Sequence, residues 1–266
     1  MRIYVDLHTH THYSLDAKYS PAEMAKGAKA RGLDAIAVCD HNEWRIFDDP
    51  VESYDALVLP CVEYSTTAGH IIGLFMKKPP VLTPCDKHYY DLADVVEGIH
   101  REGGLAVAAH PFPSESRKNG ERRISLCDGV EVFNARAMAT RRASLPDAME
   151  AAGARFFTAG SDSHSPRELG GVCLSLEVES LTAEEIRTAL LRGDGRVVGY
   201  PGAMGDKARA DYKKAKTRWQ KLHAYKKIVL HTLWDLFRRP IMNREYTVDF
   251  KSKSYTKRRK RRRLCR

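Results

Sequence analysis

The chain has 266 residues, of which 43% are hydrophobic and 29% charged, which is enough for one large core or a main domain with an appendage. Its longest apolar runs are too short to span a bilayer, and its opening residues lack the apolar segment of a secretory signal. Six cysteines occur without a Cys-x-x-Cys pair, which excludes a zinc ribbon and a disulfide framework. We therefore expect a cytoplasmic protein with reduced thiols and no transmembrane segment.

The net charge of +10 is concentrated at one end of the chain. Residues 1–200 contain 22 Lys and Arg against 29 Asp and Glu, a balance of −7, whereas residues 201–266 contain 22 against 5, a balance of +17. An acidic body and a strongly basic C-terminal region have different physical roles. We expect a body at residues 1–204, a basic amphipathic helical extension at 205–240 and a basic, disordered tail at 241–266.

Short apolar runs, mostly β-branched or rich in alanine, recur through the body. Their nearly continuous apolar character is typical of strands that are buried on both faces of a parallel sheet. The expected strands are Ile3–Leu7, Ala35–Cys39, Leu57–Val62, His70–Phe75, Leu105–Ala109, Val130–Phe133, Arg155–Ala159, Cys173–Val178 and Val197–Val198.

Helical patterns lie between the expected strands. Ser20-Pro21-Ala22-Glu23 combines a capping serine, a first-turn proline and a capping-box glutamate, and predicts a helix that stops at Gly32. The other predictions are helices at 91–102, 136–152 and 182–191, and surface loops at 77–90 and 111–125. The alternation predicts a barrel or doubly wound α/β fold, and the lack of Gly-x-Gly-x-x-Gly or Walker patterns argues against a nucleotide-binding fold.

Polar residues of metal-binding type follow the expected strands. His8 and His10 lie two residues apart at a strand end, so their imidazoles share one face and make half of a metal site. Taken alone, this pair would equally well be two solvent-facing histidines. Active sites of barrel enzymes are built at the carboxyl ends of parallel strands, so further ligands there favour a metal site. They are Asp16, Asp40, His41, Glu63, His70, His110, Glu131, Asn134, Asp162 and His164.

This series of motifs resembles the polymerase-and-histidinol-phosphatase (PHP) family over residues 1 to 200. The motifs are Asp6-Leu7-His8-Thr9-His10, Ser14-x-Asp16, Asp40-His41-Asn42, Glu63, Gly69-His70, His110-Pro111, Glu131-x-Phe133-Asn134 and Gly160-Ser161-Asp162-Ser163-His164. The resemblance implies a distorted (β/α)7 barrel, here with a C-terminal basic helical extension, and a centre of two or three divalent ions that hydrolyses phosphoesters. Manganese, zinc and iron all stay open.

The resemblance also implies how the ligands are divided among the ions. A first ion takes His8, His10, Glu63 and Asp162, a second takes Asp16, His41 and His164, and a third shares Glu63 and adds His70 and His110. Asp16 stands where some relatives use histidine, which leaves the metal's identity open. A strand-start histidine that points to solvent is the alternative for His70.

Clustered divalent ions neutralise the charge of a phosphate ester, lower the pKa of a bridging water and hold the reacting oxygens in line. We expect Asp40 to orient a ligand histidine from behind, and Arg136 to clamp phosphate oxygens with its guanidinium, although an ordinary helix residue is the alternative. A protonated histidine or aspartate near the leaving oxygen would supply a proton, and His164 is a further catalytic candidate.

The basic C-terminal region carries apolar residues every three or four positions over Lys207–Arg238, which predicts one or two amphipathic helices. We expect this apolar stripe to pack on the barrel; the alternatives are a membrane surface or an acidic partner. Residues 251–266 hold ten basic side chains and no acid, and predict a disordered tail. This tail either grips nucleic acid or anionic lipid, or keeps the protein soluble.

Three functions follow from the sequence. The first is metal-dependent hydrolysis of a small phosphomonoester or nucleotide. The second is a phosphodiesterase or exonuclease that uses residues 207–266 to hold nucleic acid. The third is a non-enzymatic scaffold that binds a polyanion or a protein. The apparently complete ligand set favours a hydrolase.

Overall fold

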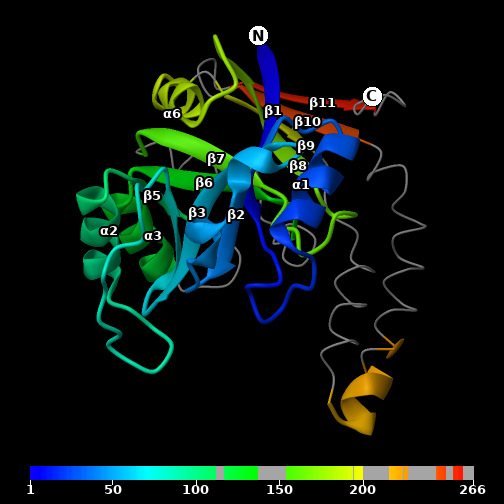
Figure 1. Ribbon diagram of the computed structural model, residues 1–266. Coiled ribbons are helices and arrows are strands. Elements are labelled where there is room, and N and C mark those ends of the chain that lie inside the picture. Colours follow the sequence, from blue (N-terminus) through cyan, green and yellow to red (C-terminus); the bar gives the residue numbers. More distant parts are fainter. Residues whose placement is uncertain are drawn as a thin grey trace.

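A computed structural model describes the protein at residues 1–111, 117–136, 154–193, 195–199, 216–223, 225–226, 244–249 and 254–259. In these ranges the strands form one sheet that curls into a nearly closed barrel, with helices on its outside (Figure 1). The strands are β1 (Arg2–Thr9), β2 (Ala35–His41), β3 (Leu57–Thr66), β4 (Gly69–Leu74), β5 (Leu105–Ala108), β6 (Gly129–Asn134), β7 (Phe156–Gly160), β8 (Val172–Glu177), β9 (Arg196–Gly199), β10 (Arg244–Asp249) and β11 (Ser254–Arg259). The helices are α1 (Pro21–Ala30), the 3-10 turns η1 (Arg45–Asp48) and η2 (Val51–Ser53), α2 (Leu92–Arg101), α3 (Arg117–Leu126) and α6 (Ala183–Leu191).

The strand order is β11-β10-β9-β8-β1-β2-β3-β4-β5-β6-β7. Strands β1, β2, β3, β5, β6 and β7 all run in one direction, whereas β4 is antiparallel to both its neighbours. Only Thr67 and Ala68 link β3 to β4, and so short a link allows a hairpin but no parallel crossover. The start of β4 therefore lies at the same edge as the carboxyl ends of the six parallel strands.

The barrel closes where the chain beyond β7 meets the end of β1. The amide of His10 donates to Ser163 O at 2.8 Å, and the amide of Asp162 donates to His8 O at 2.9 Å. This close approach requires a glycine at position 160, because a Cβ there would collide with His8. The first half of β1 pairs instead with antiparallel β8. The distorted seven-stranded barrel expected from the sequence is confirmed in β1 to β7.

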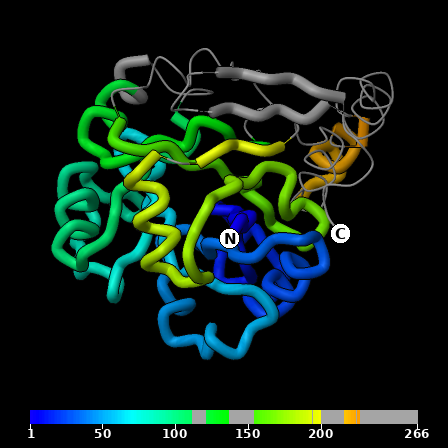
Figure 2. Tube along the Cα trace, turned by 90° about the horizontal axis from the view of Figure 1, so that it is seen from above, coloured from blue at the N-terminus to red at the C-terminus, as the bar shows by residue number. Residues whose placement is uncertain are grey.

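The helices pack on the barrel from several sides. Helix α1 contacts β2, α2 and α3 contact β4 and β5, and α6 contacts β7 and β8. Figure 2, seen from above, shows α1 and α2 on opposite sides of the barrel. The predicted start of α1 is confirmed, because Ser20 and Glu23 form a reciprocal capping box. Strand β5 is buried along its whole length, as expected of a strand covered on both faces.

Helix α3 corrects the prediction of a surface loop at 111–125. Its sequence, RKNGERRISL, is so polar that no apolar pattern marks a helix, and the buried position among residues 121–126 is an arginine, Arg123. The predicted helix at 136–152 lies outside the described residues except for its first residue. The predicted boundary at residue 204 also lies outside them and stays a prediction.

The C-terminal region differs from the sequence prediction in two respects. Strands β10 and β11 lie within the tail that was predicted to be disordered, because β10 pairs with the edge of β9 and β11 pairs with β10. Residues 216–223 and 225–226, drawn in orange in Figure 1, lie apart from the barrel strands. Trp219, Leu222 and Tyr225 are 74%, 55% and 57% exposed, so the expectation that this stripe packs on the barrel is wrong for the described residues.

No helix in the described part of the chain is both long enough and apolar enough to cross a bilayer. The cytoplasmic location expected from the sequence stays a prediction.

Candidate metal centre

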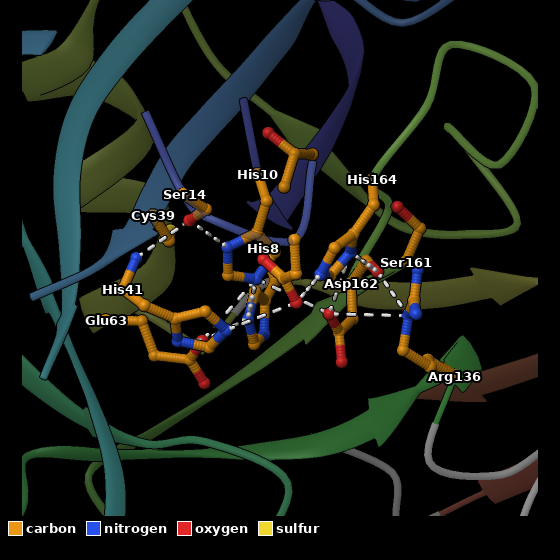
Figure 3. Close-up of polar contacts among 12 residues, drawn as sticks. His8, His10, Ser14, Cys39, His41, Glu63, Arg136, Ser161, Asp162 and His164 are labelled. Atoms are coloured by element: carbon orange, nitrogen blue, oxygen red, sulfur yellow. Dashed lines mark hydrogen bonds and ion pairs between the residues drawn. The ribbon is translucent and has the colours of Figure 1, made fainter. Parts of the chain in front are cut away.

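The nine residues predicted as metal ligands come together at the edge of the barrel where the parallel strands end. They are His8 and His10 at the end of β1, Asp16 in the loop that follows, His41 at the end of β2, Glu63 in β3, His70 at the start of β4, His110 after β5, and Asp162 and His164 after β7. Figure 3 shows the rings of His8, His10, His41 and His164 converging near the Glu63 and Asp162 carboxylates.

Glu63 lies at the centre of this group and is 1% exposed. Its Oε2 atom lies 3.0 Å from His41 Nδ1 and 3.4 Å from the Nε2 atoms of both His8 and His10. One carboxylate oxygen therefore faces three imidazole nitrogens from two different strand ends.

The other oxygen of Glu63 faces the opposite side of the cluster. Its Oε1 atom lies 2.9 Å from His70 Nδ1 and 3.1 Å from His110 Nε2. His70 therefore points into the cluster, which excludes the alternative of a solvent-facing histidine. A carboxylate that faces five imidazoles through two oxygens has the arrangement of a ligand shared between ions, because each oxygen can bind separately.

Two observations test whether these residues fit a metal. His8 Nε2 and His10 Nε2 are 3.1 Å apart and fully buried, although two nitrogen lone pairs repel unless a proton or cation lies between them. Glu63 Oε2 and His41 Nδ1 form an ion pair at 3.0 Å, and both atoms are buried without a well-formed hydrogen bond to the described residues. Buried polar atoms without a partner are costly, and nitrogen with carboxylate oxygen is a donor set that suits manganese, iron or zinc. The residues fit a metal centre.

Several overlapping sets of donors could hold an ion, each with ligand atoms within 4.8 Å of one another. The sets are His8, His10 and Glu63; His41, Glu63 and His70; His8, His110 and Asp162; and His10, His41 and His164. Asp16 joins the last set through its Oδ2 atom, which lies 2.8 Å from His164 Nε2 and 3.9 Å from His41 Nε2.

The electrostatics of the cluster give its histidines different protonation states. Burial lowers the pKa of His10 to about 3, so this ring is neutral. Burial also disfavours the charged form of His41, but the neighbouring Glu63 carboxylate outweighs it and raises the pKa of His41 to about 9. Burial raises the pKa of Glu63, but His70 and His8 outweigh it and hold that pKa well below its usual range. Glu63 is therefore an anion at neutral pH.

Two of the residues adopt left-handed backbone conformations. His110 has φ 29° and Asp162 has φ 54°, a region that is uncommon for residues other than glycine. Such strain persists only where the surrounding structure enforces it, and it is concentrated at functional sites. Each residue follows the last residue of its strand by two positions, where the chain turns the side chain back over the barrel edge.

Glu131 contacts two residues of the cluster, His8 and His110. Its Oε1 atom lies 2.9 Å from His8 Nδ1, and its Oε2 atom accepts from the amide of His110 at 2.8 Å and from Asn134 Nδ2 at 3.0 Å. A carboxylate on Nδ1 leaves Nε2 of His8 facing the cluster, as in many metal sites. The sequence pattern included Glu131 but did not identify this role.

Asp40 corrects the prediction that it orients a ligand histidine directly. It accepts from Thr11 N at 2.7 Å, Thr11 Oγ1 at 2.6 Å and Ser14 N at 3.2 Å, and no contact with a histidine is found among the described residues. Ser14 Oγ in turn lies 3.4 Å from His10 Nδ1. Asp40 therefore holds the loop after β1, and the described contacts connect it to the cluster through Ser14.

Arg136 lies beside Asp162 at the margin of the cluster (Figure 3). Its Nε donates to Asp162 O at 2.9 Å, and its Nη2 donates to Glu168 Oε2 at 3.3 Å. The same Glu168 oxygen accepts from the amide of His164 at 2.7 Å. Sequence reasoning missed Glu168, for which an acid four residues after His164 is the only signal. The role of Arg136 in binding phosphate oxygens stays a prediction.

Comparison with known proteins decides the family. Residues 6–155 match the sequence profile of the PHP domain. The chain belongs to the PHP family. This PHP chain is 36% identical over 146 residues to an uncharacterized protein of Methanocaldococcus jannaschii, across 49% of this chain and 81% of that protein. It is 24% identical over 246 residues to a probable phosphatase of Shewanella frigidimarina, across 80% of this chain and 98% of that protein.

A solved structure shares the fold of this PHP chain. It is a two-domain protein from Bacteroides vulgatus that contains a predicted PHP-like metal-dependent phosphoesterase. The TM-score is 0.57 at 18% sequence identity, and the match covers 80% of this chain and 70% of that one.

Proposed function

We propose that this PHP domain hydrolyses small phosphomonoesters, including nucleotides, at a centre of two or three divalent ions. The observation that carries the proposal is the buried Glu63 carboxylate, which faces five imidazole nitrogens through both its oxygens. The proposed ligands are His8, His10, Glu63 and Asp162 for a first ion, Asp16, His41 and His164 for a second, and Glu63, His70 and His110 for a third.

Bound divalent ions supply the positive charge that a phosphate ester needs before it can accept an attacking water. The chain's own residues hold the proposed ligands in position. Glu131 fixes His8 with Nε2 toward the cluster, and the loop held by Asp40 presents Ser14 to His10. Arg136 brings a guanidinium to the margin of the cluster, where phosphate oxygens can accept from it.

The pair of Asp16 and His164 has two candidate roles. Their 2.8 Å contact joins two groups that either bind the second ion or hold a proton for the leaving oxygen. Counting the protons released on metal binding separates the two roles, because ligation displaces this proton.

The substrate class is supported by the similarity to a probable phosphatase and by the loops at this edge of the barrel. Leu15 lies between Ser14 and Asp16 with its side chain exposed, and Trp44 is exposed shortly after His41. An exposed aliphatic and an exposed aromatic side chain in the loops that follow β1 and β2 suit the organic part of a phosphomonoester such as a nucleotide.

A substrate panel tests the proposal. Nucleoside 5′-monophosphates and p-nitrophenyl phosphate are compared with bis-p-nitrophenyl phosphate, each with Mn²⁺, Zn²⁺, Fe²⁺ and Mg²⁺. We expect kcat/KM for the best monoester to exceed that for the diester by about tenfold or more, which corresponds to ~1.4 kcal/mol. Faster hydrolysis of the diester would contradict the proposal.

A second candidate function, hydrolysis of single-stranded nucleic acid, is favoured by residues 216–226. Trp219 and Tyr225 are exposed beside Arg218, Lys221 and Lys226, and the described residues of this segment include no acid. Nucleic-acid grooves combine aromatic side chains for base stacking with cations for the phosphates. A labelled oligonucleotide tests this function with the full chain and with Trp219→Ala combined with Lys221→Ala. We expect binding to weaken in the variant and with added salt.

A further inference from the structure

Helix α3 contributes a buried cation to the interior beside the cluster. Arg123 is 0% exposed, although α3 is one of the most polar of the helices that the structure describes. Its Nη1 atom donates to Ala109 O at 2.9 Å and to His70 O at 3.0 Å. One guanidinium nitrogen thus bridges the end of β5 and the start of β4.

The two carbonyls adjoin residues of the cluster. One belongs to His70 itself, and the other belongs to the peptide that leads into His110, whose φ is 29°. The amide of Ala109 also donates to His70 O at 3.1 Å, just beyond the last paired residues of β4 and β5. The Arg123 bridge therefore fixes the peptides that aim both imidazoles at Glu63 Oε1.

An arginine is needed here for physical reasons. Burying a cation is costly unless strong hydrogen bonds offset the lost hydration, so an arginine with a purely packing role would be disfavoured. The two N–H bonds of Nη1 are fixed in the guanidinium plane, whereas the N–H bonds of a lysine ammonium rotate on a flexible stem. The arginine can thus hold two carbonyls at a fixed separation.

We propose that Arg123 is a positioning residue that sets the separation of His70 and His110 and so builds the third ion site, which these residues share with Glu63. The proposal rests on the metal centre of the proposed function. His70 Nδ1 and His110 Nε2 approach the same oxygen of Glu63 at 2.9 and 3.1 Å, so a shift of either peptide would separate these donors.

The test is a Co²⁺ titration of the full chain, followed by the visible absorption of the bound ion, with Arg123→Lys and Arg123→Ala. We expect one class of Co²⁺ site to weaken about 10- to 100-fold, the range found when support behind metal ligands is removed, while the other sites keep their affinity. Added guanidinium ion should restore the weakened site in Arg123→Ala. Arg122→Ala, an exposed arginine of the same helix, is the matched control and should titrate as the wild type does.

The outcomes separate this proposal from the proposed function. If the wild type binds Co²⁺ and hydrolyses a monoester but Arg123→Lys titrates identically, the positioning role is wrong and the metal centre stands. Equal weakening of every site, without rescue by guanidinium, would indicate a merely structural arginine and also overturns the proposal. If Arg123→Ala fails to fold, the titration of Arg123→Lys decides. A wild type that binds no Co²⁺ overturns both proposals.

Discussion

The two ends of the barrel both bury acidic side chains, but they satisfy these acids differently. Where β6 begins, Asp128 is 8% exposed and accepts from Ala106 N at 2.9 Å, with Arg155 Nη1 at 3.1 Å and His100 Nε2 at 2.7 Å. Where the strands end, Glu63 Oε2 is buried without a hydrogen-bond partner among the described residues. An acid with fixed donors stabilises a fold, whereas an acid whose donors are incomplete is suited to a ligand.

The largest loss of activity is expected when a proposed metal ligand at the carboxyl ends of the strands is removed. His10→Ala or Asp162→Ala should each lower kcat/KM by about 10³-fold or more, since a metal-dependent reaction loses several kcal/mol of transition-state stabilisation. Steady-state kinetics at saturating metal measure the change. Circular dichroism should show that both variants stay folded, and full activity in both variants would refute the proposed centre.

A smaller loss, measured as metal affinity, is expected when Glu131 is changed, because its carboxylate contacts His8 Nδ1. Glu131→Gln keeps the size of the side chain but removes the charge that holds His8 Nδ1, so metal affinity should fall about 10- to 100-fold. Isothermal titration with Mn²⁺ measures this affinity. Asp128→Asn, the same change at the other end of the barrel, is the control and should leave it unaltered. An equal loss of Mn²⁺ affinity in both variants would contradict the proposal that the two ends of the barrel have different roles.

Metal affinity should also depend on pH. Burial disfavours the protonated form of His41, but Glu63 raises the pKa of this ring to about 9, so a proton occupies it below that pH and must leave before metal binds. Apparent affinity should therefore fall as the pH falls below 9, by about tenfold per unit for each proton displaced. Titration at pH 7 and pH 8 in buffers of different ionisation enthalpy counts those protons. Affinity that does not change with pH would show that His41 is no ligand.

The smallest effect on turnover is expected from the opposite end. Asp128→Asn should leave kcat within about twofold but lower the free energy of unfolding by ~2 kcal/mol, because the charged hydrogen bonds to Arg155 and His100 are weakened. Urea unfolding measures the stability. A variant with normal stability and impaired turnover would show that the two ends are not specialised as described.

The sequence predicted the barrel and the gathering of the nine proposed ligands at one edge, because both depend on local order along the chain. Residues such as His8, Glu63 and Asp162 follow or end apolar runs, and parallel strands bring their ends to one edge. Asp40 was expected to contact a ligand histidine, but it accepts from Thr11 and Ser14 of the loop after β1 instead. Neighbouring residues on a strand point to opposite faces, so Asp40 and His41 face different surroundings.

Other features depend on contacts that local pattern does not contain. Arg123 is buried because α3 packs beside two strand ends far from it in sequence, and the helix itself is polar. Strands β10 and β11 occur in a basic region because β9 offers an edge for pairing, which composition cannot reveal. Contacts between distant parts of the chain therefore determine both the burial of Arg123 and the formation of β10 and β11.

A count of bound ions, measured together with turnover, tests whether Glu63 and its neighbours hold the ions on which hydrolysis depends. The full chain is stripped with a chelator, dialysed against Mn²⁺ and analysed for metal, and hydrolysis of a nucleoside monophosphate is followed in the same samples. We expect two or three ions per chain, turnover that returns as the sites fill, and loss of both in Glu63→Gln. Full turnover in the stripped protein, or a refilled protein without bound ions, would contradict it.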